Sequence, residues 1–225
     1  MSWLSDLFRR KNRETEKEAG NGSNSETESE PTAPEMRYLI VGLGNVGGEY
    51  AGTRHNIGFA AVEYFVQRHE GVFQSDRYAY SATFRHKNKQ LTVLKPTTYM
   101  NLSGKAVRYH MEKLHIPMEN LMVISDDKDL PLGQLRVKAQ GSGGTHNGLN
   151  NIIELLQSSQ FPRMRIGIGN DFPKGRQIDF VLGRFTEEEC VALRPTLERC
   201  SEALLCFVDQ GVQKCMNQFN TKGSR

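Results

Sequence analysis

The distribution of apolar and polar residues divides the chain near residue 36. Residues 13–36 are rich in Glu, Ser, Asn and Pro and contain almost no large apolar side chains. Such a segment cannot bury enough surface to offset its chain entropy, so we expect residues 1–35 to form a disordered acidic extension. A short amphipathic helix over 2–12, with a membrane surface or a partner as its contact, is the alternative to a loose tail there. Its apolar side chains are Trp3, Leu4, Leu7 and Phe8.

From Arg37 onward, apolar runs and helix-period patterns alternate along the chain. The pattern predicts strands over 37–43, 81–88, 90–96, 121–125, 134–139 and 164–169. It predicts helices over 56–69 and 103–114, a third that ends near 157, and a long last helix. Thr186 and Glu189 form a capping box that starts the last helix. Alternating strands and helices indicate a single α/β domain over 36–220 with a mixed, largely parallel sheet, and we expect 221–225 to be disordered.

Composition excludes several classes of protein. No stretch approaches the roughly 18 uninterrupted apolar residues of a membrane span, so we expect no integral membrane contact. The first residues do not resemble a secretory signal, because Asp6 interrupts the apolar positions and Arg9 and Arg10 follow them. The four cysteines lie between Cys190 and Cys215 without a C-x-x-C pair, which argues against zinc and against a disulfide framework. We therefore expect a cytoplasmic protein.

The net charge of +3 is unevenly distributed. Residues 1–36 contain five Lys or Arg and eight Asp or Glu, a net of −3. The remaining residues contain 24 basic and 18 acidic side chains, a net of +6. A basic body with an acidic extension is compatible with a polyanionic partner, but this charge by itself supports nucleic-acid binding only weakly.

The sequence GLGNVG at 42–47 matches the G-x-G-x-x-G pattern of dinucleotide-binding proteins and follows a predicted strand. In those proteins a helix begins within the motif and its N-terminus meets the pyrophosphate. Here further glycines and the polar residues 53–56 delay the helix, and Glu63 lies inside that helix instead of ending a second strand. We therefore reject a nicotinamide or flavin oxidoreductase and interpret the glycines as enabling a sharp turn.

Four loops, each after a strand or before a helix, contain small polar residues among glycines: 42–56, 95–104, 125–133 and 141–148. In an open α/β sheet the loops at the carboxyl ends of the strands converge on the ligand crevice. The polar residues that they present are Asn45, His55, Asn101, Asp126 and Asn147. A histidine held by an aspartate can take a proton from water, and amides can donate to a developing oxyanion. No G-x-S-x-G elbow indicates a serine nucleophile.

Each of these residues also has a purely structural interpretation. Asn45 could be a turn residue with positive φ, and His55 a structural histidine before a helix. Asp126 could cap a turn, Asn101 could cap a helix, and the run His146–Gly148 could be a turn. Composition and spacing alone indicate an α/β hydrolytic enzyme and leave these alternatives open.

Six motifs in order resemble the bacterial-type peptidyl-tRNA hydrolase family, from Met36 to about Phe219. They are YLIVGLGN, TRHNIGF, LKPTTYMNLSGKAV, LPLGQLRVK, THNGLNNI and RMRIGIGN. Three others, GIGNDFP, QIDFVLGRFTEEE and MNQFN, resemble the Bacteroidetes branch. The resemblance implies a monomer with a twisted mixed sheet flanked by helices. It also implies hydrolysis of the ester between a peptide and the 3′ end of tRNA, with no metal or organic cofactor.

The resemblance also implies roles for individual residues. His55 matches the catalytic base and Asp126 the residue that orients it, and Asn45 matches an amide that positions water or carbonyl. Asn101 and Asn147 match amides that bind the peptidyl and 3′-adenosine end. The remaining matches are aromatic crevice residues, Tyr50 and Tyr99, and phosphate-contacting basic residues, Arg136, Lys138 and Arg165.

The chain departs from the family pattern at three places. Val46 replaces a usual Pro, Ser125 replaces a frequent His, and GSGGTHNG replaces a form with one more histidine, which leaves the mobility of loop 141–148 open. A non-catalytic RNA-binding relative on the same scaffold is the alternative function. The intact set of His55, Asp126 and three amides favours the enzyme.

Overall fold

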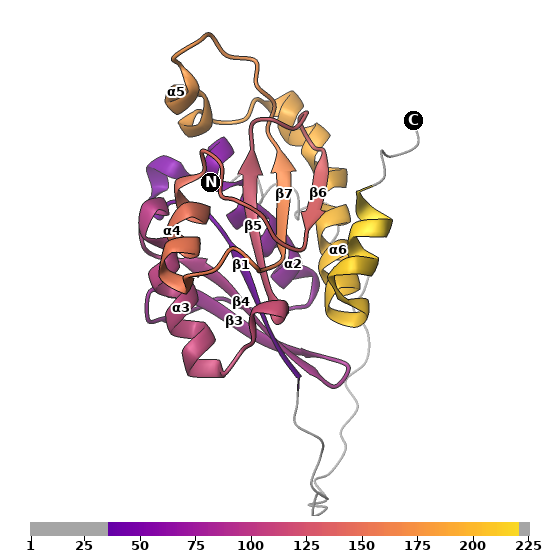
Figure 1. Ribbon diagram of the computed structural model, residues 1–225. Coiled ribbons are helices and arrows are strands. Elements are labelled where there is room, and N and C mark those ends of the chain that lie inside the picture. The colour runs from indigo at the N-terminus through magenta and orange to yellow at the C-terminus, as the bar shows by residue number, and fades with distance from the viewer. Residues whose placement is uncertain (1–35, 221–225) are drawn as a thin grey trace, which may run out of the picture.

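A computed structural model describes residues 36–220. The predicted disordered extension over 1–35, the helix over 2–12 and the disordered end over 221–225 lie outside the described residues and stay predictions. The described part is one α/β domain whose seven-stranded sheet has the order β2-β3-β4-β1-β5-β7-β6 (Figure 1). The strands are β1 Met36–Gly42, β2 Gln74–Asp76, β3 Ala79–His86, β4 Lys89–Pro96, β5 Leu121–Asp127, β6 Leu135–Lys138 and β7 Arg163–Gly167.

Helices connect and flank these strands. The α-helices are α2 Ile57–Arg68, α3 Ser103–Leu114, α4 Asn147–Leu156, α5 Gln177–Leu182 and α6 Glu187–Phe219. Short 3-10 turns are η1 Gly48–Tyr50, η2 Arg54–Asn56, η3 Met100–Leu102 and η4 Met118–Asn120. Within residues 36–220, no helix has both the length and the apolar character that a membrane crossing requires.

The sheet is mixed and mostly parallel at its centre, as predicted. Strands β4, β1, β5 and β7 are parallel neighbours, while β3 and β6 pair antiparallel with the strands beside them. Strand β1 is buried on both faces: Tyr38 and Ile40 pack with α2 and α6, and Leu39 and Val41 pack with α3 and α4. Figure 1 shows α3 and α4 on one side of the sheet and α6 on the other.

The start of α2 lies unusually close to the ends of β1 and β5. A Cβ atom at Gly58 would lie 2.5 Å from the carbonyl oxygen of Leu43 and 2.7 Å from that of Ile124. Gly42 faces Gly58 with equally little space. Gly42, the last residue of β1, therefore permits close strand–helix packing and not only a turn, and this packing brings η2 to the carboxyl edge of the sheet.

Besides the 3-10 turns, one strand and one α-helix of the described residues were not predicted, and both are short. Strand β2 has three residues, and α5 has six, none of them buried. The capping box before α6 is confirmed, since the Thr186 hydroxyl accepts from the Glu189 N–H at 3.2 Å and Glu189 accepts from the Thr186 N–H at 2.8 Å. Helix α6 is interrupted at Gly211, where φ is 81°.

The last described residue ties the end of α6 to the edge strand β6. The Asn220 amide accepts from the Val137 N–H at 2.7 Å and donates to the Val137 carbonyl at 2.9 Å. One side chain thus pairs both backbone groups of a residue on the open edge of the sheet.

Candidate active site

A cavity of about 490 Å³ lies where the carboxyl ends of β1, β4 and β5 meet the start of α4. Eight of the ten residues predicted for the site line it: Asn45, His55, Tyr99, Asn101, Asp126, Lys138, Asn147 and Arg165. Tyr50, in η1, and Arg136, on β6, do not line it. The loops predicted to converge on a crevice therefore do so, as expected for an open α/β sheet.

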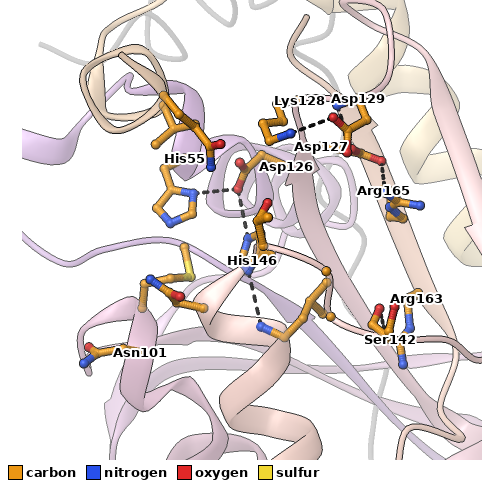
Figure 2. A pocket seen from close by; sticks show the side chains of 18 of the residues that line it. His55, Asn101, Asp126, Asp127, Lys128, Asp129, Ser142, His146, Arg163 and Arg165 are labelled. Atoms are coloured by element: carbon orange, nitrogen blue, oxygen red, sulfur yellow. Dashed lines mark hydrogen bonds and ion pairs between the residues drawn. The ribbon is translucent and has the colours of Figure 1, made fainter. Parts of the chain in front are cut away.

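His55 and Asp126 form the centre of the site (Figure 2). His55 Nδ1 lies 2.7 Å from Asp126 Oδ1, and the two side chains are only 14% and 6% exposed. Burial lowers the pKa of His55, but the hydrogen bond and the negative charge of Asp126 outweigh it, so the pKa is raised. The interpretation of His55 as only a structural residue does not explain this paired, cavity-lining position.

Asp126 has a second partner, His146, whose Nε2 lies 3.0 Å from the same Oδ1 atom. His146 Nδ1 accepts a hydrogen bond from the Leu149 N–H at 3.3 Å, so the proton of a neutral His146 must be on Nε2. Burial raises the pKa of Asp126, but His146 and His55 more than offset this and hold the pKa well below its usual range. Asp126 therefore accepts from both histidines, and His55 Nε2 is left as the basic atom.

Sequence reasoning missed His146, which it treated as one residue of a turn. His146 is in fact the N-cap of α4, and its ring lies 5.0 Å from the His55 ring, centre to centre. The signal available was its place directly before Asn147 in a predicted site loop. The turn-capping interpretation of Asp126 is wrong, whereas Asp127 does cap its turn by accepting from the Asp129 N–H at 2.9 Å.

Ligand atoms of His55, Asp126 and His146 lie within 4.8 Å of one another, a spacing that could suit a metal ion. A metal on His146 Nε2 would require the proton to move to Nδ1, against the N–H of Leu149. The hydrogen bonds thus favour a proton-bridged cluster, and the expectation that no metal takes part stays a prediction.

Asn45 is held by a second asparagine, Asn56. The Asn45 N–H donates to Asn56 Oδ1 at 2.8 Å, and Asn56 Nδ2 donates to the Asn45 carbonyl at 2.9 Å. Asn45 Oδ1 accepts from the Met100 N–H at 2.8 Å, which leaves its Nδ2 group as the donor for a ligand. Asn45 does not have positive φ, so the turn interpretation is wrong. Asn56, which directly follows His55, was not predicted.

Three other predicted residues of the cavity are open to solvent. Asn101 and Asn147 are exposed, and Tyr99 is 61% exposed. Asn101 does not cap α3: within residues 36–220 its side chain forms no hydrogen bond, and the N-cap of α3 is Leu102. These amides can therefore bind a ligand without losing an internal contact.

Basic side chains line one side of the cavity, and Figure 2 shows Arg163 and Arg165 on the side away from Asn101. Arg165 pairs with Asp127 at 2.5 Å, so part of its charge is compensated. Arg163, which was not predicted, is buried, bonds the carbonyls of Ser142 and Ser159, and has its pKa lowered to about 10 by burial and by nearby Arg165.

Arg136 faces Arg165 in the β6–β7 register outside the cavity. It is exposed, so it extends the basic surface beyond the cavity wall. The basic positions predicted from the resemblance therefore lie on neighbouring strands, β6 and β7.

The fold and the site together define an α/β protein whose cavity contains a hydrogen-bonded histidine–aspartate pair and a wall of basic side chains. The chain belongs to the peptidyl-tRNA hydrolase family, whose model matches residues 39–225. It is 52% identical over 187 residues to the peptidyl-tRNA hydrolase of Parabacteroides distasonis. That alignment covers 83% of this chain and all of the relative. It is 50% identical over 185 residues to that of Porphyromonas gingivalis, covering 82% of this chain and again all of the relative.

Solved structures agree with this assignment. The crystal structure of peptidyl-tRNA hydrolase from Acinetobacter baumannii matches with a TM-score of 0.78 and 33% sequence identity, over 84% of this chain and 97% of that one. The resemblance to the family and to its Bacteroidetes branch is thus confirmed, as is the predicted α/β fold.

Proposed function

We propose that this chain hydrolyses the ester bond between a peptide, or an N-blocked amino acid, and the 3′ end of tRNA. The observation that carries the proposal is the hydrogen bond of 2.7 Å from His55 Nδ1 to Asp126, which leaves Nε2 at the cavity as the base. Family membership and the named relatives support the substrate class.

His55 Nε2 takes a proton from a water molecule, whose oxygen attacks the ester carbonyl carbon. Asp126 keeps the proton on Nδ1 and stabilises the imidazolium that forms, and His146 holds Asp126 from the other side. Asn45 Nδ2 donates to the oxyanion of the tetrahedral intermediate. When the intermediate collapses, the ribose oxygen leaves with the proton carried by His55, which restores the neutral base.

The rest of the cavity binds the two arms of the substrate. Lys138 and Arg165 attract tRNA phosphates, and Arg136 extends this surface without reading bases. The exposed Asn101 and Asn147 bind the peptidyl and 3′-terminal groups. Tyr99 offers a ring for stacking, and Tyr50 is proposed only as a neighbouring aromatic residue outside the cavity. We further propose that the enzyme works as a monomer in the cytoplasm.

The test is incubation with an N-blocked aminoacyl-tRNA, with the free aminoacyl-tRNA as the control substrate. We expect release of the blocked amino acid alone, loss of release in His55→Ala with tRNA binding retained, and normal release in His115→Asn. His115 is an exposed histidine at the end of α3 with φ of 52°, a conformation that asparagine tolerates. Binding of tRNA without release by the wild type would instead identify a non-catalytic RNA-binding relative.

A further inference from the structure

Arg54, the residue before His55 in η2, makes an unusual number of contacts. Its side chain is only 11% exposed and does not line the active-site cavity. Nη1 donates to the Arg184 carbonyl at 2.7 Å, and Nη2 donates to both carboxylate oxygens of Glu189 at 2.9 and 2.7 Å. One buried guanidinium thus joins the histidine turn to the segment before α6 and to the first turn of α6.

Backbone contacts run alongside this side chain. The Arg54 N–H donates to the Gly183 carbonyl at 2.9 Å, and the Phe185 N–H donates to the Gly52 carbonyl at 3.2 Å. Thr53 and Arg184 form an isolated antiparallel bridge between these two segments. Residues 52–54 and 183–185 are therefore paired like two short strands.

Glu189 serves two partners at once. It accepts from the Thr186 N–H in the capping box of α6 and also neutralises Arg54. A buried arginine without such a partner would be strongly destabilising, so the pair and the helix start depend on each other.

Helix α5 needs an external anchor, and Arg54 supplies one. None of the six residues of α5 is buried, and Figure 1 shows this helix projecting beyond the edge of the sheet. The Arg54 guanidinium lies 4.5 Å from the Phe180 ring centre and 5.3 Å from that of Phe185. On its other side α5 presents Ile178, Val181 and Leu182 to the active-site cavity.

We propose that Arg54 is a positioning residue that fixes the α5 wall of the cavity relative to His55. Arg54 thereby links the proposed base, His55, to α5, the wall against which the substrate packs. Loss of the Arg54 contacts should weaken substrate binding, because α5 then moves away from the cavity. The His55–Asp126 pair stays intact, because Asp126 lies on β5. This prediction of a binding effect rests on the proposed function.

The test compares Arg54→Lys and Glu189→Gln with Arg176→Lys, a control in the exposed Arg176–Asp179 pair next to the same helix. Lysine keeps the charge but cannot bond Glu189 and the Arg184 carbonyl together in a fixed plane. For N-acetyl-aminoacyl-tRNA we expect both variants to raise KM about tenfold with kcat within about twofold, and the control to change neither. The acid midpoint of the rate should stay at the wild-type pH.

Hydrogen exchange provides a readout that does not depend on activity. In both variants the amides of 177–183 should exchange about tenfold or more faster, while those of β5 keep wild-type protection. Unchanged KM with unchanged exchange in 177–183, or a lower melting temperature as the only effect, would overturn the proposal. A loss of kcat without a rise in KM would overturn it too. If the wild type releases nothing from the substrate, the proposed function fails, and the exchange experiment still decides the role of Arg54.

Discussion

Replacing Asp126 by asparagine tests the central hydrogen bond of the site. Asparagine is nearly isosteric, and its side-chain oxygen can still accept a hydrogen bond from His55 Nδ1, but it has no negative charge. In the wild type, burial lowers the pKa of His55 and the hydrogen bond and charge of Asp126 raise it, with a net increase. The variant retains the burial and loses the charge, so the pKa of His55 must fall.

Coulomb's law sets the scale of this change. The bonded atoms are 2.7 Å apart, which places the centres of charge of the two groups farther apart. Unit charges about 4 Å apart interact by about 4 kcal/mol at an effective dielectric constant of 20, an upper bound of about three pH units. Because asparagine keeps one hydrogen bond to His55, we expect the pH at which the rate is half its maximum to fall by about one to two pH units.

The assay is kcat/KM for release of an N-blocked amino acid from tRNA, measured from pH 5 to 9, a range that spans about 6.5, the usual pKa of histidine. Protonated His55 cannot accept a proton, so the wild-type rate should fall in acid with a midpoint above about 6.5. In Asp126→Asn the midpoint should lie below about 6.5, and the plateau should fall about 10²-fold or more, because the imidazolium loses its counter-charge.

Asp129→Asn is the matched control, since this nearby carboxylate is exposed and pairs with Lys128 instead of a histidine. Asp129→Asn should have the same acid midpoint of kcat/KM as the wild type. An unchanged or higher midpoint in Asp126→Asn would refute the reasoning, because the charge of Asp126 would then not be what raises the pKa of His55.

Three further predictions follow from the packing and the charges. Gly58→Ala should destabilise the fold by about 3 kcal/mol and lower the melting temperature by roughly 6–12 °C, because its Cβ would lie 2.5 Å from a backbone oxygen. Gly48→Ala is the control, because its Cβ would have nothing within 4 Å, and it should leave the melting temperature unchanged in the same thermal scan. Lys138→Ala should reduce the salt dependence of tRNA binding by about one unit in log Kd against log salt, and Arg165→Ala by less, because Asp127 already compensates its charge. Deleting residues 1–35 should change neither the melting temperature nor the release rate, since β1 begins at Met36; a drop in either would show that the extension docks on the body.

Most of the fold could be predicted because its strands and helices contain regular apolar patterns. The strands β1 and β5 each contain a continuous apolar run, and α3 repeats its apolar positions with the helical period. Strand β2 and helix α5 contain no such pattern, because neither buries enough side chains to need one. Their conformation depends on contacts with distant residues, which a local pattern does not encode.

The site shows the same limit in another form. The resemblance and the loop positions identified His55 and Asp126. They did not identify the hydrogen bond from His146 to Asp126 or the hydrogen bonds between Asn56 and Asn45. His146 is 20 residues from Asp126 along the chain, and Asn56 is 11 residues from Asn45, so both contacts exist only after folding. A histidine in a glycine-rich loop has several possible roles, and only its position in space distinguishes them.

The two hydrogen bonds between Asn220 and Val137 on β6 have a consequence for association between molecules. An edge strand with free N–H and C=O groups is a template on which a strand of another chain can add. The Asn220 amide occupies both groups of Val137 and so blocks one of the positions where such pairing would begin. The residue that follows the last helix thereby opposes strand addition at this edge, and we expect a chain that ends before Asn220 to lose this barrier while the sheet itself stays complete.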